Sequence, residues 1–80
     1  MAGYRVQVEV AGHAKEYFPG GQDRFDVELD EPATVSEILA HLGVPSELVM
    51  AVFSAGERRD KDYVAPTGAT ITLLTPPSGG

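Results

Sequence analysis

The residues best placed to do chemistry are the last five of the chain, Pro76-Pro77-Ser78-Gly79-Gly80. The α-carboxylate of Gly80 is expected to be ionised at pH 7, because the reference pKa of such a group is about 3.3–3.7. A carboxylate repels nucleophiles, so it reacts only after activation, most simply as a mixed anhydride with AMP. A persulfide could then displace AMP and leave a thiocarboxylate.

The chain lacks the machinery for this activation. It contains no cysteine, so it has no thiolate nucleophile and no cysteine-based zinc site. It has no glycine-rich phosphate loop leading into a helix and no nucleophile elbow. Its two histidines, His13 and His41, lie in separate segments, so no metal site is expected. We therefore expect no bound cofactor, and we expect ATP to be used by an activating partner.

The residues beside Gly80 suit a narrow site on another protein. Pro76 and Pro77 restrict φ and favour an extended chain of about 3.1 Å per residue, so the last five residues would reach about 15 Å. The small residues that follow the prolines allow close approach. We predict a folded domain over residues 1–75 and an extended tail over residues 76–80 that enters a partner's active site. The alternative is a binding domain whose tail is incidental.

Length and charge exclude several classes of protein. The chain has 80 residues, with 12 Asp and Glu against 6 Lys and Arg and a net charge of −6, so a single acidic domain is expected. Binding to nucleic acid or to an anionic membrane requires a basic face, so neither is expected. No apolar run approaches the roughly 20 residues of a membrane span, and the first residues lack the apolar core of a signal peptide. A cytoplasmic protein is the resulting expectation.

Two segments in the first half alternate apolar and polar residues with the period of a half-buried strand, residues 4–10 and 24–29. They predict an antiparallel hairpin with a long loop, in which Tyr17 and Phe18 pack against the edge of the core. The side chains expected to face the core are Tyr4, Val6, Val8, Val10, Phe25, Val27 and Leu29.

A short helix is predicted after this hairpin. Thr34 is a favourable N-cap, and Glu37 stands three residues later, at the spacing of a capping box. Gly43 suits a left-handed C-terminal position, and Pro45 prevents continuation. The apolar stripe of this helix consists of Val35, Ile38, Leu39 and Leu42.

The second half of the chain predicts shorter elements. They are a helical turn over residues 46–49, a strand over 50–55, a solvated charged loop over 57–62, a short edge strand at Tyr63-Val64, a turn at Pro66-Thr67-Gly68 and a last strand over 70–75.

This order of elements predicts an α+β domain with a mixed sheet of four to five strands and one helix packed across it. The first and last strands can pair at the centre of the sheet. That topology is a β-grasp, the ubiquitin-like arrangement, and it would make the tail project from the end of a central strand.

Strand alternation also predicts a docking surface. If Val52 points inward, Phe53 points outward on the helix-free face, and Leu74 points outward on the same face. The two side chains could then form an exposed apolar patch, which often marks a partner site. The alternatives are that Phe53 lies under a loop or that the inward and outward positions of the strand are shifted by one residue. Arg58 and Arg59 are candidates for contact with an acidic partner.

In length and element order the whole chain resembles the MoaD/ThiS sulfur carriers, a family of ubiquitin-like proteins that end in Gly-Gly. The resemblance is strongest over residues 70–80, TITLLTPPSGG. The Pro-Pro-x-Gly-Gly ending is more similar to the small subunit of molybdopterin synthase than to the thiamine carrier. The segment Thr34-Val35-Ser36-Glu37 also fits the start of the family's helix.

The resemblance implies that Gly80 is adenylated by a ubiquitin-activating-like adenylyltransferase and converted to a thiocarboxylate with sulfur from a cysteine desulfurase or a rhodanese-type donor. Gly79 and Gly80 are the residues that carry this function. The sulfur would pass to a pterin precursor in a molybdopterin synthase completed by a large subunit, so the chain would not be catalytic alone. Two alternatives stay open: a protein modifier conjugated through Gly80, and a sulfur carrier for thiamine, tungsten-cofactor or amino-acid biosynthesis.

Overall fold

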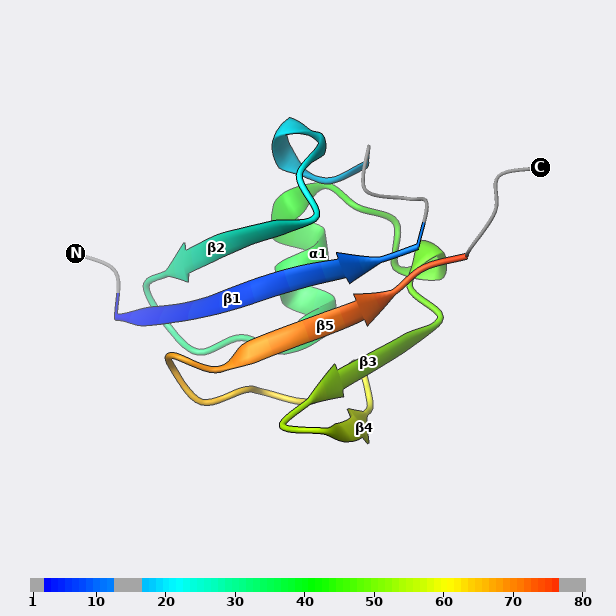
Figure 1. The fold of residues 1–80 in the computed structure, drawn as a ribbon. Helices are drawn as coiled ribbons and strands as arrows, with labels where there is room; N and C mark the ends of the chain where they lie inside the picture. Colours follow the sequence, from blue (N-terminus) through cyan, green and yellow to red (C-terminus); the bar gives the residue numbers. More distant parts are fainter. Residues whose placement is uncertain (1–2, 13–16, 77–80) are drawn as a thin grey trace.

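The computed structural model describes residues 3–12 and 17–76, and in this part of the chain it contains one five-stranded sheet and one α-helix (Figure 1). The strand order is β2-β1-β5-β3-β4. The central strands β1 and β5 are parallel, and the other neighbours are antiparallel. The α+β prediction with a mixed sheet and one helix is therefore confirmed. The elements are β1 (Tyr4–Ala11), β2 (Arg24–Leu29), α1 (Val35–Leu42), β3 (Ala51–Ser54), β4 (Glu57–Arg59) and β5 (Thr70–Leu74), with short 3₁₀ turns at Pro19–Gly21 and Ser46–Leu48.

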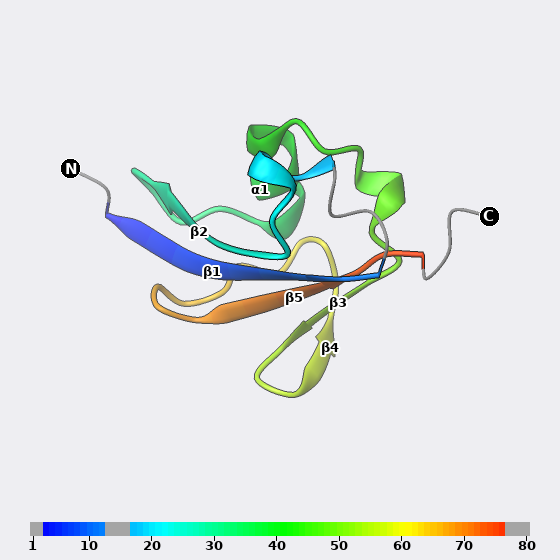
Figure 2. The same ribbon diagram turned by 45° about the horizontal axis from the view of Figure 1, so that its top comes forward.

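The helix α1 covers one face of the sheet, and the described residues place no helix on the other face (Figure 2). Its start and end follow the sequence prediction. The Thr34 Oγ1 accepts a hydrogen bond from the Glu37 backbone N–H at 3.1 Å, and the Glu37 carboxylate accepts one from the Thr34 N–H at 2.8 Å. Gly43 ends the helix at a φ of 75°, in the left-handed region that glycine adopts without strain.

The core lies between α1 and the sheet. The alternation predicted for β1 is confirmed, since its four inward residues are buried. Tyr4 reaches through the core, and its hydroxyl donates a hydrogen bond to the Ala65 carbonyl at 2.7 Å. Burial raises the pKa of the Tyr4 phenol, and the nearby Tyr63 raises it further. The largest fully buried side chains are Tyr4, Ile38, Leu39, Ile71, Leu73, Val6, Val8, Val35, Val52 and Thr75.

The loop between β1 and β2 gives one correction. Phe18 is buried as predicted, and its ring centroid lies 6.0 Å from that of Phe25. Tyr17, however, is 54% exposed, so the prediction that it packs against the core is wrong. Only Phe18 of this adjacent pair is directed into the core.

The second correction concerns the edge of the sheet. The charged run was expected to be a loop, but its first three residues form β4, which pairs with β3. Ala55 and Gly56 join the two strands with φ values of 55° and 77°, the positive signs that a two-residue type I′ hairpin requires. Edge strands often carry charged side chains, so the polarity of the run does not exclude a strand.

The edge strand predicted at Tyr63-Val64 is not found. The backbone of this segment has another role, because the Tyr63 carbonyl accepts the Val35 N–H at 3.1 Å and the Lys61 carbonyl accepts the Ser36 N–H at 3.0 Å. These N–H groups belong to the first turn of α1 and have no partner within the helix. The segment therefore caps the helix instead of extending the sheet.

Candidate functional site

The predicted reactive tail begins at Pro76, one residue beyond Thr75, which follows the end of β5. Of its five residues the structure describes Pro76, which is partly buried. The other four, Pro77-Ser78-Gly79-Gly80, lie outside the described residues. The geometry that bears on the tail is therefore that of its attachment to the sheet.

The attachment point is hydrogen-bonded on both sides. On the β3 side, the Met50 N–H donates to the Leu74 carbonyl at 2.7 Å. On the β1 side, the Thr75 backbone N–H and the Thr75 Oγ1 both donate to the Ala11 carbonyl, at 2.7 and 2.8 Å. Thr75 itself has an exposed fraction of 0%. The last residue before the prolines is thus held inside the domain.

Gly12 completes this attachment. Its φ is +113°, and a Cβ built on it would overlap the Oγ1 and the carbonyl oxygen of Thr75. The backbone leaving β1 therefore lies directly against the end of β5. Neither Gly12 nor Thr75 was singled out in the sequence, because a glycine after a strand and a threonine within one are common. The predicted pairing of the first and last strands at the centre of the sheet was the one signal that could have directed attention to them.

The second part of the candidate site is on the helix-free face. Phe53 is 37% exposed and Leu74 is 36% exposed. Phe53 lies opposite Thr72, and Leu74 lies opposite Ala51, so the two apolar side chains occupy diagonal positions on one face of β3 and β5. The outward direction predicted for both is confirmed. Contact with a partner remains a prediction. We call these four residues, Ala51, Phe53, Thr72 and Leu74, the sheet-face patch.

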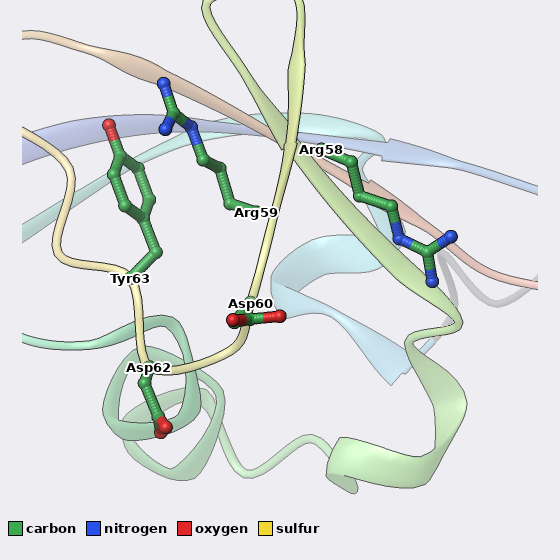
Figure 3. Close-up of a pocket in the computed structure, with 5 residues that line it drawn as sticks. All are labelled: Arg58, Arg59, Asp60, Asp62 and Tyr63. Atoms are coloured by element: carbon green, nitrogen blue, oxygen red, sulfur yellow. The ribbon is translucent and has the colours of Figure 1, made fainter.

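A shallow hollow of about 530 Å³ lies beside β4 (Figure 3). The Arg59 guanidinium stacks over the Tyr63 ring at 4.7 Å from its centroid and contacts the Glu57 carboxylate at 3.5 Å. Arg58 points away from this pair and lies opposite Phe53 in the β3–β4 ladder. The lining consists of Arg58, Arg59, Asp60, Asp62 and Tyr63. Arg59 is thus engaged within the chain, and contact of Arg58 or Arg59 with an acidic partner stays a prediction.

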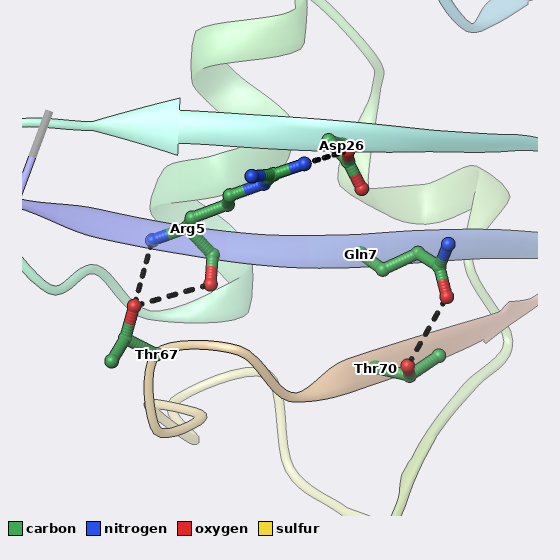
Figure 4. A network of polar contacts seen from close by, with 5 residues as sticks. All are labelled: Arg5, Gln7, Asp26, Thr67 and Thr70. Carbon is green, nitrogen blue, oxygen red and sulfur yellow. Dashed lines mark hydrogen bonds and ion pairs between the residues drawn. The ribbon is translucent and has the colours of Figure 1, made fainter.

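Polar side chains cover the helix-free face over β1 and β2 (Figure 4). Arg5 pairs with Asp26 at 2.6 Å, and this hydrogen bond is the main cause of a raised pKa at Arg5. The Thr70 hydroxyl donates to the Gln7 side-chain oxygen at 3.3 Å. The exposed Arg5–Asp26 ion pair contributes little to stability. The effect of these polar side chains is to confine the apolar part of this face to the sheet-face patch.

Other kinds of site find no support in the part of the chain that the structure describes. Among residues 3–12 and 17–76, no group of three or more His, Asp or Glu side chains could hold a metal ion. His13 lies outside these residues. No helix in the same ranges has the length and apolar character to cross a membrane.

Searches against protein-family models and curated proteins found no match to this sequence. The fold and the site geometry are thus the observations from which a function can be inferred.

Proposed function

We propose that this chain is a ubiquitin-like sulfur carrier that works through the carboxylate of Gly80. The observation that carries the proposal is the attachment of the tail to the sheet. The last strand is a central strand, and its end is hydrogen-bonded on both sides. A tail that starts from such a point has a fixed base, which a group that must be presented to several different active sites needs.

The proposal includes a β-grasp fold. A hairpin of β1 and β2, a helix across one face, and a last strand placed beside the first are the features of that fold, and the strand order β2-β1-β5-β3-β4 supports it.

The proposed chemistry divides between the chain and its partners. The Gly80 carboxylate attacks the α-phosphorus of ATP on a ubiquitin-activating-like adenylyltransferase, and pyrophosphate leaves. The terminal sulfur of a persulfide, on a cysteine desulfurase or rhodanese-type donor, then attacks the acyl carbon, and AMP leaves. A second thiol on a partner cleaves the resulting acyl disulfide, which releases the thiocarboxylate and forms a disulfide on the partner. The chain contains no cysteine, so every thiol in this sequence belongs to a partner.

We propose molybdopterin synthesis as the destination of the sulfur, with this chain as the small subunit of a cytoplasmic synthase. The carboxy-terminal Pro-Pro-x-Gly-Gly pattern supports this choice over the thiamine carrier. The sheet-face patch would dock the adenylyltransferase and the large subunit of the synthase in turn, because both must receive the same tail from the same side. Phe53 is 37% exposed and Leu74 is 36% exposed, so both side chains are accessible to such a partner.

The test is the intact mass of the protein after incubation with a ubiquitin-activating-like adenylyltransferase, a persulfide donor and ATP. We expect a gain equal to the exchange of one oxygen for sulfur, and no gain without ATP. Deletion of Gly80 should abolish the gain and leave the circular dichroism spectrum unchanged. An intact chain that gains no sulfur would refute the proposal. Conjugates of higher mass that resist thiol reductants would instead favour a protein modifier.

A further inference from the structure

Thr75 is an unusual residue to find at the base of a tail. It is polar, it is completely buried, and it is the last residue before the two prolines. A buried hydroxyl needs a hydrogen-bond partner. The Thr75 hydroxyl donates to the Ala11 carbonyl, 64 residues away in sequence.

We propose that Gly12 and Thr75 form a clamp that sets the direction in which the chain leaves the domain at Pro76. Thr75 is then a positioning residue, which acts on the reaction through the tail and not by contact with the reacting atoms. The positioning role of Thr75 in the reaction rests on the proposed function, whereas the clamp itself does not.

Three constraints converge on Thr75. Its N–H and its Oγ1 share one acceptor, the Ala11 carbonyl, at 2.7 and 2.8 Å, so backbone and side chain are tied to the same point of β1. A β-branched side chain has few χ1 rotamers. The residue before a proline is restricted to extended backbone. Together these constraints leave little freedom in the dihedral angles that orient Pro76.

Gly12 is the second residue of the clamp and lies directly against Thr75. Because it has no Cβ, its backbone can lie against the Oγ1 and the carbonyl oxygen of Thr75, where any side chain would overlap them. Its φ of +113° also strains every other residue type. A methyl group at this position would therefore have to displace Thr75 or the backbone of β1.

The length of the tail determines how far its tip moves when the chain direction at Pro76 changes. A rotation of about 20° at the base would move the tip of an extended tail about 15 Å long by about 5 Å. Reaction requires the attacking and receiving atoms to lie about 3–3.5 Å apart and aligned. A small rotation at the clamp would therefore displace the Gly80 carboxylate by more than the distance that reaction tolerates. The same rotation would not move the sheet-face patch.

The kinetic test compares Thr75→Val, Thr75→Ser and a matched control, Thr67→Val. The hydroxyl of Thr67 also bonds to the backbone of β1, accepting from the Arg5 N–H at 3.1 Å, but it does so at the opposite end of the sheet from the tail. With the adenylyltransferase and ATP, we expect Thr75→Val to lower kcat by at least about 10-fold while KM for the carrier stays unchanged. Thr75→Ser keeps the hydroxyl but loses the β-branch, so it should restore most of the lost kcat. Thr67→Val should behave as wild type.

A role confined to stability would give a different result. In that case kcat measured well below the unfolding temperature would not change, and any loss would follow the unfolding temperature across all variants. Either that outcome, or a Thr75→Val variant with wild-type kcat, would overturn the positioning role. A wild-type chain that is not adenylated at all would refute the proposed function instead.

The clamp has a test that needs no partner. Amide hydrogen exchange should show the Thr75 N–H protected in the wild type, and Gly12→Ala should accelerate its exchange by at least about 10-fold. The amides of Val8 and Ile71 in the central strands serve as the internal control and should keep their protection. If Gly12→Ala loses protection everywhere, Thr75→Val takes its place in the same measurement. Unchanged exchange at Thr75 in a folded variant would disprove the clamp.

Discussion

The N-terminus of α1 offers the most direct test of the physical reasoning, through the replacement Thr34→Ala. The wild-type chain satisfies the first N–H groups of this helix in two ways. The Glu37 N–H donates to the Thr34 Oγ1 at 3.1 Å, and the Thr34 N–H donates to the Glu37 carboxylate at 2.8 Å. Alanine removes the first of these acceptors and leaves one N–H to water.

The size of the effect depends on what holds the rest of the turn. The Val35 and Ser36 N–H groups are accepted by carbonyls of the segment over residues 61–63, at 3.1 and 3.0 Å. Those bonds do not involve Thr34, so the helix should not unravel. We therefore expect the loss of a single cap, about 1 kcal/mol within a range of about 0.5–2. In an 80-residue domain each kcal/mol lowers the unfolding temperature by about 4–8 °C.

The assay is urea unfolding followed by far-ultraviolet circular dichroism, with Thr34→Ser as the matched control that keeps the hydroxyl. The m-value should stay constant and the midpoint should fall for alanine only. Adding Glu37→Ala to complete a double-mutant cycle should show a coupling of about 0.5 kcal/mol or more, because the two bonds are reciprocal. An alanine variant within about 0.3 kcal/mol of the wild type, or a serine variant as unstable as alanine, would refute the reasoning.

Three further predictions concern other parts of the molecule. Burial, followed by the nearby Tyr63, raises the pKa of Tyr4, so the folded state holds the phenolic proton more tightly than the unfolded state does. The stabilisation that results should be complete below pH about 10 and should be lost as the pH rises above it. Tyr4→Phe should remove this fall in the free energy of unfolding, as measured by urea titrations. Replacing both Phe53 and Leu74 with threonine should raise KM for the adenylyltransferase by about 10-fold without changing kcat, and an unchanged KM would contradict the docking role. Tyr63→Leu should lower the free energy of unfolding by about 0.5–1 kcal/mol by removing the contact with Arg59 at 4.7 Å; if Arg59→Gln abolishes none of this effect in a double-mutant cycle, that contact is not its cause.

The helix and the central strands could be predicted from the sequence because their signals are local. The capping box at Thr34 and Glu37 is a contact between residues three apart, and the sequence shows both. The alternation over β1 reports a face that is buried along its whole length. The outward direction of Phe53 and Leu74 followed from the same alternation, so this half of the candidate site was accessible without a structure.

The edge of the sheet could not be predicted in the same way. The strand β4 faces solvent, so burial imposes no periodic pattern on its charged residues. The segment at Tyr63 has an apolar character that favours a strand, yet its carbonyl group is used by the first turn of α1. That choice depends on where the helix lies in space.

The clamp at the base of the tail belongs wholly to the tertiary structure. Gly12 and Thr75 are ordinary residues until the parallel pairing of β1 with β5 brings their backbones together. The sequence by itself determined which groups the chain possesses, including an acidic surface, a capped helix, alternating strands and a glycine tail. Only the folded chain decided which of them meet, because close packing brings together groups that are distant in sequence and depends on the position of every element at once.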